Sequence, residues 1–139
     1  MKNKSFTLLV TVLAVTLAIT GCAPKTSPER HARQYIKATS DDLNPNFVVK
    51  KTDSIRMMVP FFEQFYEVGA KDKAAGISPD EALQRANYFQ SEEFLQSIKS
   101  QETFAGKTYT SSGLKSAQEQ KSMGEAISGA YMDGYHGVS

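Results

Sequence analysis

Residues 53–76, DSIRMMVPFFEQFYEVGAKDKAAG, are the most apolar stretch of the chain beyond its N-terminus, and their pattern sets the expected fold. Apolar side chains recur there at steps of three and four, which is the spacing of one helix face. This face consists of Ile55, Met58, Phe62, Phe65 and Val68. Asp53 suits an N-cap and Gly76 suits a C-cap. Pro60 lacks an amide hydrogen and crowds the turn before it, so we expect either one kinked helix or two helices broken after Val59.

The clearest local signal follows directly, in the sequence SPDE at residues 78–81. Its serine and glutamate form a capping box, with proline at the first helical position. Similar chemistry occurs earlier in the chain, in the sequence SPE at residues 27–29. We expect a helix there with Ser27 as its N-cap and its end near Thr39.

The second half of the chain carries further helix signals. Ser91 is suited to cap a helix over residues 92–104, EEFLQSIKSQETF. The sequence GKTYTSSG at 106–113 predicts a loop, in which residues 108–110 could form a short extended piece. The tail has two rows at steps of four, which predict a closely packed helix. These rows are Met123, Ile127, Tyr131 and Tyr135, and beside them Ala126, Ala130 and Gly134.

These signals together predict an all-α fold, with four to five helices in one small domain over residues 28–139. Val48 and Val49 are suited to a short strand, but two residues are too few to imply a sheet. The expected core consists of Ile55, Phe62, Phe65, Leu83, Phe89, Phe94, Ile98, Ile127 and Tyr131.

The N-terminus has the pattern of a targeting segment, because two early lysines precede 14 uncharged residues at positions 6–19. A helix of that length spans about 21 Å, whereas a membrane span needs roughly 20 apolar residues. Residues 1–21 are therefore interpreted as a signal peptide that is removed. The segment ends in ITGC at 19–22, which resembles a bacterial lipobox. An ordinary signal peptide with a coincidental cysteine, or an uncleaved anchor, are the alternatives.

Lipidation explains the position of Cys22, the only cysteine in the chain. A thiolate is the nucleophile that accepts a diacylglyceryl group, and cleavage between Gly21 and Cys22 frees an amine for further acylation. Residues 22–27 then comprise the lipidated cysteine and a short tether. When fully extended, the four residues 23–26 span about 13 Å. Ala23 stands where enterobacterial lipoproteins of the inner membrane carry aspartate. The expected location is the outer membrane, facing the periplasm.

Composition limits the function classes that remain. Removal of residues 1–21 leaves 118 of 139 residues, with 14 basic and 15 acidic side chains. This balance gives no basic patch for nucleic acid. With Cys22 lipidated no disulfide is expected, and no cofactor is expected either. The predicted contacts are the membrane, through the lipid, and an unidentified envelope protein.

Two sets of polar residues are candidate sites. Ser128, Asp133 and His136 suggest a hydrolase triad, but no nucleophile elbow surrounds the serine, so we expect a polar helix face and no enzyme. His31 is suited to pair with Glu29 or with a metal. Zinc needs three or four ligands and the chain has only two histidines, so a surface histidine without metal is expected.

The sequence FFEQFY at 61–66 has more aromatic side chains than one narrow stripe can hold. Phe62 and Phe65 suit the core. Phe61 and Tyr66 are therefore predicted to reach a second surface, formed by another helix or by a partner protein.

Three segments, SPERHARQYI, DSIRMMVPFFEQFYEVGAKDKAAGISPDEALQR and AYMDGYHG, resemble an enterobacterial family of small lipoproteins. The family is named after the type-two entry-exclusion protein of colicin plasmids, and the resemblance spans most of the chain after Cys22. It implies hindrance of incoming plasmid DNA, and it transfers one residue role, lipid attachment at Cys22. The expected function is a non-enzymatic lipoprotein with a helical protein-interaction domain. The alternative is a structural or assembly factor of the cell envelope.

Overall fold

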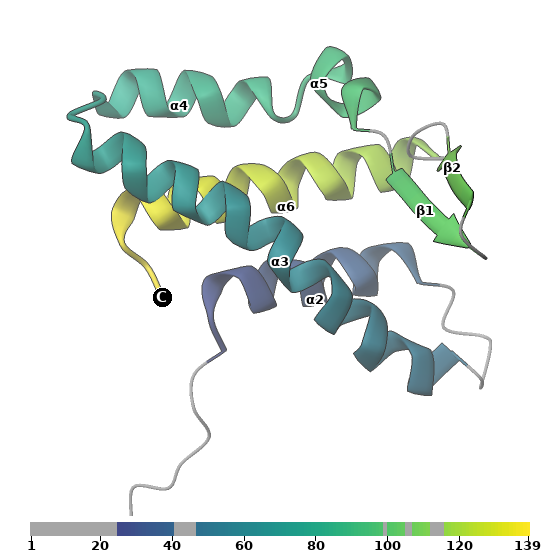
Figure 1. The fold of residues 1–139 in the computed structure, drawn as a ribbon. Helices are drawn as coiled ribbons and strands as arrows, with labels where there is room; N and C mark the ends of the chain where they lie inside the picture. Colours follow the sequence, from purple (N-terminus) through teal and green to yellow (C-terminus); the bar gives the residue numbers. More distant parts are fainter. Residues whose placement is uncertain (1–24, 41–46, 99, 105–106, 112–115) are drawn as a thin grey trace, which may run out of the picture.

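Five helices and one β-hairpin make up the part of the chain that the computed structural model describes, which is residues 25–40, 47–98, 100–104, 107–111 and 116–139 (Figure 1). The elements are α2 (Ser27–Thr39), α3 (Phe47–Ala74), α4 (Pro79–Tyr88), α5 (Glu92–Ser97), β1 (Ser100–Phe104), β2 (Lys107–Ser111) and α6 (Ala117–His136). The domain is all-α, as predicted. The predicted signal peptide, Cys22 and residues 23–24 of the tether lie outside the described residues.

Helix α2 begins one residue earlier than expected. Thr26, rather than Ser27, is the N-cap, and its side-chain oxygen accepts a hydrogen bond from the Glu29 amide. The prediction of Ser27 as the cap was wrong because both residues suit that role, and tertiary packing decided between them. Ser27 is fully buried and bonds to another helix instead.

Helix α3 is one continuous helix with Pro60 inside it, so the chain does not break after Val59. The helix starts at Phe47, which makes the predicted strand at 48–49 and the predicted cap at Asp53 both wrong. A proline removes one hydrogen bond and crowds a turn. Here the helix packs against α2 and α6 along its length, and such packing supplies most helical stability in proteins.

The end of α3 has the predicted glycine cap. Gly76 has a φ of +79°, a conformation that glycine adopts without a Cβ penalty. The Gly76 amide donates to the Lys73 carbonyl at 3.1 Å, and the Ile77 amide donates to Asp72 at 3.0 Å. The capping box that starts α4 is also confirmed, because Ser78 and Glu81 exchange both hydrogen bonds. A sharp reversal between α3 and α4 follows from these two caps.

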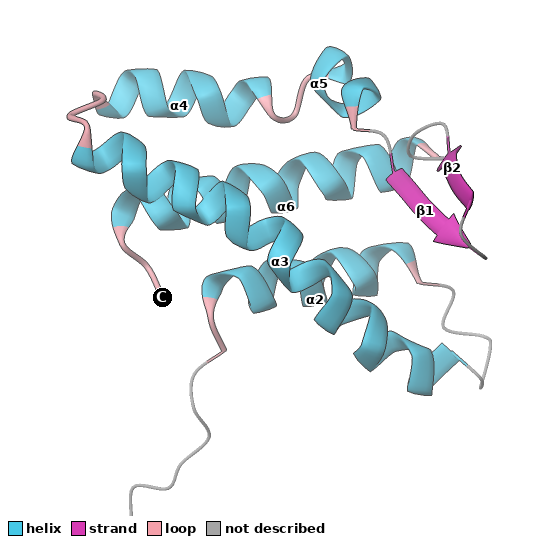
Figure 2. Ribbon diagram, in the orientation of Figure 1, coloured by secondary structure: helices cyan, strands magenta, loops and turns pink. Residues whose placement is uncertain are grey.

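Ser91 caps α5 as predicted, but α5 ends at Ser97, and the expected continuation to residue 104 was wrong. Residues 100–104 instead form β1, which pairs antiparallel with β2 from Ser100↔Ser111 to Phe104↔Lys107. Figure 2 shows this hairpin at one end of the helices. Threonine and aromatic residues favour strands, which accounts for the hairpin. The short extended piece predicted at 108–110 is confirmed as part of β2, which replaces the predicted loop at 107–111. Residues 106, 112 and 113 lie outside the described residues.

Helix α6 lies at the centre of the core, where it contacts α2, α3, α4 and α5. Its two predicted rows are buried. Of the expected core, Ile55, Phe62, Ile127 and Tyr131 are buried, while Phe65, Phe89, Phe94 and Ile98 are partly buried against it. Leu83 was expected in the core and is 52% exposed, and Val68, on the predicted apolar face of α3, is 39% exposed. Helix α4 turns the small Ala82 and Ala86 inward instead. The buried core also contains Ala32, Ala82, Ala86 and Leu95, which follow the apolar spacing of their helices but were not in the expected core.

Helices α3 and α6 cross at backbone contact. A Cβ built on Gly134 would lie 1.9 Å from the Tyr66 carbonyl oxygen, and one on Gly69 would lie 1.9 Å from the Tyr131 carbonyl oxygen. Only glycine permits this approach. The crossing holds the buried rings of Tyr131 and Tyr135 against the α3–α4 reversal, where the Tyr135 hydroxyl donates to the Ile77 carbonyl at 2.6 Å.

Candidate functional site

The densest polar cluster of the described residues surrounds Asp133 of α6. Three side chains of α2 donate to its Oδ2 atom. Ser27 Oγ lies at 2.7 Å, His31 Nε2 at 2.9 Å and Arg30 Nη2 at 3.1 Å. Arg30 Nη1 also donates to the Ser139 carbonyl oxygen at 2.7 Å, so this cluster joins the start of α2 to the C-terminal end of the chain.

The Asp133 carboxyl is held in its ionised form. Burial acts to raise its pKa, but the hydrogen bonds from Ser27 and His31 and the nearby charges of His31 and Arg30 outweigh burial and lower the pKa below its ordinary value. An ionised carboxylate only accepts hydrogen bonds, so His31 carries a proton on Nε2. The cluster contributes stability above the ordinary aspartate pKa, and this contribution is lost as the pH falls through the lowered value.

The predicted triad of Ser128, Asp133 and His136 does not assemble. Ser128 is buried and its hydroxyl accepts a hydrogen bond from Gln90 at 3.1 Å. His136 is exposed and packs edge-on against Tyr135. Asp133 bonds to α2 instead. Ser27 and His31 do not replace the missing members, because each donates to Asp133, so the imidazole does not accept the serine proton as it would in a triad. Ser27 is also fully buried.

His31 is not the surface histidine that was predicted, because its side chain is only 14% exposed. Its Nδ1 atom is buried without a hydrogen-bond partner, and a Cβ on Gly129 would come within 3.0 Å of it. Among the residues that the structure describes, no group of three His, Cys, Asp or Glu side chains could hold a metal ion. One sequence signal pointed to a partner for Asp133, although not to His31. Asp133 follows Ala126 by seven residues and so lies on the same packed side of the helix, where a carboxylate needs a partner.

A second polar cluster joins α6 to α3 and α4. The Tyr131 hydroxyl donates to Asp72 Oδ2 at 2.7 Å, and Arg85 Nη1 lies 2.7 Å from the same oxygen. Burial, together with the hydrogen bond to Asp72 and its charge, raises the pKa of Tyr131 to about 12. Because each member is bonded to a partner in another helix, we interpret this cluster as structural.

Exposed apolar side chains gather on α3 and α4. Val68, Tyr88 and Phe89 line a shallow pocket of about 540 Å³, with Glu81 and Arg85 among its polar residues. Val68 is 39% exposed and Tyr88 is 49% exposed. Leu83 of α4 is also exposed, at 52%, but it is not among the residues that line this pocket. An apolar floor with a polar, mixed-charge border is typical of a protein-interaction surface.

The predicted partner residues lie elsewhere on α3. Phe61 is half-buried, with its ring centroid 5.3 Å from those of both Phe62 and Phe65. Tyr66 is half-buried, and its carbonyl faces the α6 crossing. Contact of Phe61 or Tyr66 with a partner stays a prediction. The exposed positions on α4 were missed because sequence spacing alone placed Leu83 inside.

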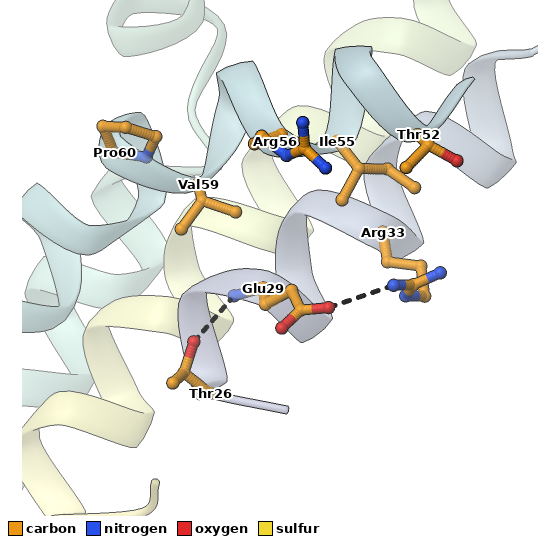
Figure 3. Close-up of a pocket in the computed structure, with 8 residues that line it drawn as sticks. All are labelled: Thr26, Glu29, Arg33, Thr52, Ile55, Arg56, Val59 and Pro60. Atoms are coloured by element: carbon orange, nitrogen blue, oxygen red, sulfur yellow. Dashed lines mark hydrogen bonds and ion pairs between the residues drawn. The ribbon is translucent and has the colours of Figure 1, made fainter. Parts of the chain in front are cut away.

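A groove of about 380 Å³ separates α2 from α3 (Figure 3). Ile55, Val59 and Pro60 give it an apolar side on α3. Arg33 of α2 extends beside it and donates to Glu29 at 3.0 Å, while its Nε atom is buried without a partner. A second, more open hollow of about 620 Å³ lies on the outer face of α2 and is lined by basic residues.

No family model, no curated protein and no solved structure matches this chain. None of the helices in the described ranges has the length and apolar character that a membrane crossing requires.

Proposed function

We propose that the chain is a lipid-anchored, non-enzymatic lipoprotein of the outer membrane, whose periplasmic helical domain binds another envelope protein. The observation that carries this proposal is the apolar pocket on α3 and α4 that the exposed Val68 and Tyr88 line together with the half-buried Phe89. The two helices are firmly joined by the caps at Gly76 and Ser78, so the surface is preformed. A preformed apolar surface binds at a smaller cost in conformational entropy than a flexible one.

The anchor is supported by the sequence. Cys22 ends a lipobox-like motif after a 14-residue uncharged run, and it is the only cysteine. Helix α2 begins at Ser27, five residues later, so attached acyl chains would keep the domain close to the membrane surface. The family resemblance supports exclusion of incoming plasmids as the role of the interaction. The alternative role is assembly or support of the envelope.

A photo-cross-linking amino acid introduced in cells at Tyr88 tests the interaction surface. We expect one discrete protein adduct from Tyr88 and from Val68, because both exposed side chains line the same pocket. Lys121 is the matched control position, since its side chain is 72% exposed on α6 and it is not among the residues that line the pocket. Adducts that are equal at Lys121, or absent from both Tyr88 and Val68, would contradict the proposed interface.

Plasmid mobilisation separates the two roles. Recipient cells that carry the wild-type protein should take up a mobilised plasmid less often than cells that carry Tyr88→Glu, which places a charge on the apolar surface. Lys121→Glu is the control for the added charge. An adduct at Tyr88 with unchanged mobilisation would favour the envelope-assembly role.

A further inference from the structure

The outward face of α2 is basic. Lys25, Arg30, Arg33 and Lys37 line the open hollow of about 620 Å³ together with Gln34 and Ala38, and no acidic residue is among these lining residues. We call the four cationic residues the α2 basic face. It stands out because the chain after residue 21 has almost balanced charge, with 14 basic and 15 acidic side chains.

The helix geometry fixes this face outward. Arg30, Arg33 and Lys37 follow one another at steps of three and four, so they share one side of α2. The opposite side carries the buried Pro28 and Ala32, which pack into the domain. Rotation of α2 to hide the charges would expose that apolar side, so the basic face is a permanent feature of the surface.

The four cations are partly preorganised. Arg30 is held by Asp133 and by the Ser139 carbonyl, and Arg33 is held by Glu29, yet each arginine side chain remains 41% exposed. Lys25 and Lys37 are exposed, and within the described residues neither makes an ion pair. The arginines therefore have fixed positions with part of their charge neutralised, while the two lysines carry most of the available positive charge.

The position of this face in the chain indicates its occupant. Lys25 follows Cys22 by three residues, which at full extension is about 11 Å. If Cys22 carries lipid, α2 is the element nearest to the membrane, and anionic headgroups are the first ligand its cations meet. An acidic protein would first have to diffuse to the region between α2 and the membrane. The lipid headgroups are already there, because the anchor holds α2 beside them.

We propose that the α2 basic face docks on the membrane by binding the phosphate groups of anionic phospholipids, which fixes the orientation of the anchored domain. This inference rests on the proposed lipid anchor at Cys22. Figure 1 shows α2 and α4 on opposite sides of the domain. Docking through α2 therefore turns the exposed surface of α4 away from the membrane, where it meets a protein partner.

The size of the effect follows from the two lysines. Each lysine or arginine near an anionic surface changes the docking equilibrium by about five-fold. Lys25→Gln combined with Lys37→Gln should therefore reduce the docked population relative to the undocked one by about 25-fold at low salt. Raising the ionic strength to about 1 M shortens the Debye length to about 3 Å and should weaken docking of the wild-type protein too.

The test uses the full lipidated chain in vesicles, with a fluorophore on Gln34→Cys in the centre of the face. Vesicles contain phosphatidylcholine alone or with one quarter phosphatidylglycerol, and a quencher sits on a minority of headgroups. We expect strong quenching only with phosphatidylglycerol at low salt. The Lys25→Gln, Lys37→Gln variant should lose it, and a fluorophore on Leu83→Cys should show none.

Lys71→Gln combined with Lys121→Gln is the matched control, because it removes two exposed lysines from other faces. This control should keep the quenching. Equal quenching in both vesicle types, or equal losses in the two double variants, would overturn the docking proposal. A failed anchor gives a different result, since the protein would then not float with phosphatidylcholine vesicles at all. A protein adduct from a cross-linker at Gln34 in cells, in place of lipid contact, would also overturn it in favour of an acidic protein partner.

Discussion

Gly134→Ala perturbs the crossing of α3 and α6 at the point where their backbones touch. The added Cβ would lie 1.9 Å from the Tyr66 carbonyl oxygen and 2.7 Å from the carbonyl carbon. Ordinary contact begins at 3.4 Å, so the helices must separate by more than an ångström at the crossing. Neither backbone atom can rotate away as a side chain would, and the separation disturbs the packing of both helices.

Two effects of opposite sign determine how much Gly134→Ala changes the free energy of unfolding. Alanine is favoured over glycine inside a helix by about 1 kcal/mol, which alone would stabilise α6. Overpacking of a well-packed site costs about 1–3 kcal/mol and occasionally more, and a clash between backbone atoms belongs at the upper end. We expect a net loss of about 2 kcal/mol in the free energy of unfolding, out of about 5–10 kcal/mol for a domain of this size.

Thermal melting followed by circular dichroism measures this loss. A net change of 2 kcal/mol should lower the melting temperature by roughly 6–12 °C in a domain of this length. Gly124→Ala is the matched control, because it gives the same propensity gain in the same helix. Its Cβ meets nothing closer than the Gln90 Cα at 3.1 Å, which requires a shift of only a few tenths of an ångström.

The refuting result is a Gly134→Ala protein that melts at or above the wild-type temperature. Helix propensity would then outweigh packing, and α3 and α6 could not cross at backbone contact at this position. If Gly124→Ala melted as low as Gly134→Ala, the loss would not be specific to the crossing.

Phe62→Ala should cost about 3–5 kcal/mol in the free energy of unfolding because Phe62 is fully buried, whereas Leu83→Ala should change it by less than about 0.5 kcal/mol, as urea denaturation would show. Tyr131 favours its neutral form in the folded protein, so its contribution to stability is present below pH 10 and is lost as the pH rises towards about 12. In an alkaline titration followed by tyrosinate absorbance, Tyr131→Phe should therefore lack the last ionisation step of the wild-type protein. Cys22→Ser should abolish incorporation of a clickable fatty acid, and equal labelling of the serine variant would refute lipidation. Ala23→Asp should move the protein towards the inner membrane in a density gradient, and an unchanged distribution would reject the sorting rule.

The sequence by itself determined the features that depend on neighbours within a few residues. The capping box of Ser78 and Glu81, the left-handed Gly76 and the cap at Ser91 all form as their local chemistry predicts. The all-α class follows from these signals, together with apolar steps of three and four. Each of these contacts closes a loop of only a few residues, so its outcome needs no knowledge of the rest of the fold.

Only the tertiary structure decided which of several suitable residues does what. Ser27 and Asp133 are 106 residues apart, and their hydrogen bond selects Thr26 as the cap of α2. The close packing of α4 on α6 turns Ala82 inward and leaves Leu83 exposed. Pro60 is accommodated within α3 in the same way, because contacts along the whole helix outweigh one missing hydrogen bond.

The candidate sites also differ in whether local sequence or tertiary packing reveals them. The sequence predicts lipidation at Cys22 through a contiguous motif, but it could not find the α2 basic face or the exposed surface of α4. Both depend on which side of a helix the neighbouring helices cover, and that choice is made by the packing of the whole domain. A charge or an apolar residue has the same local pattern whether it is covered or exposed, so only the assembled fold distinguishes a core position from a binding surface.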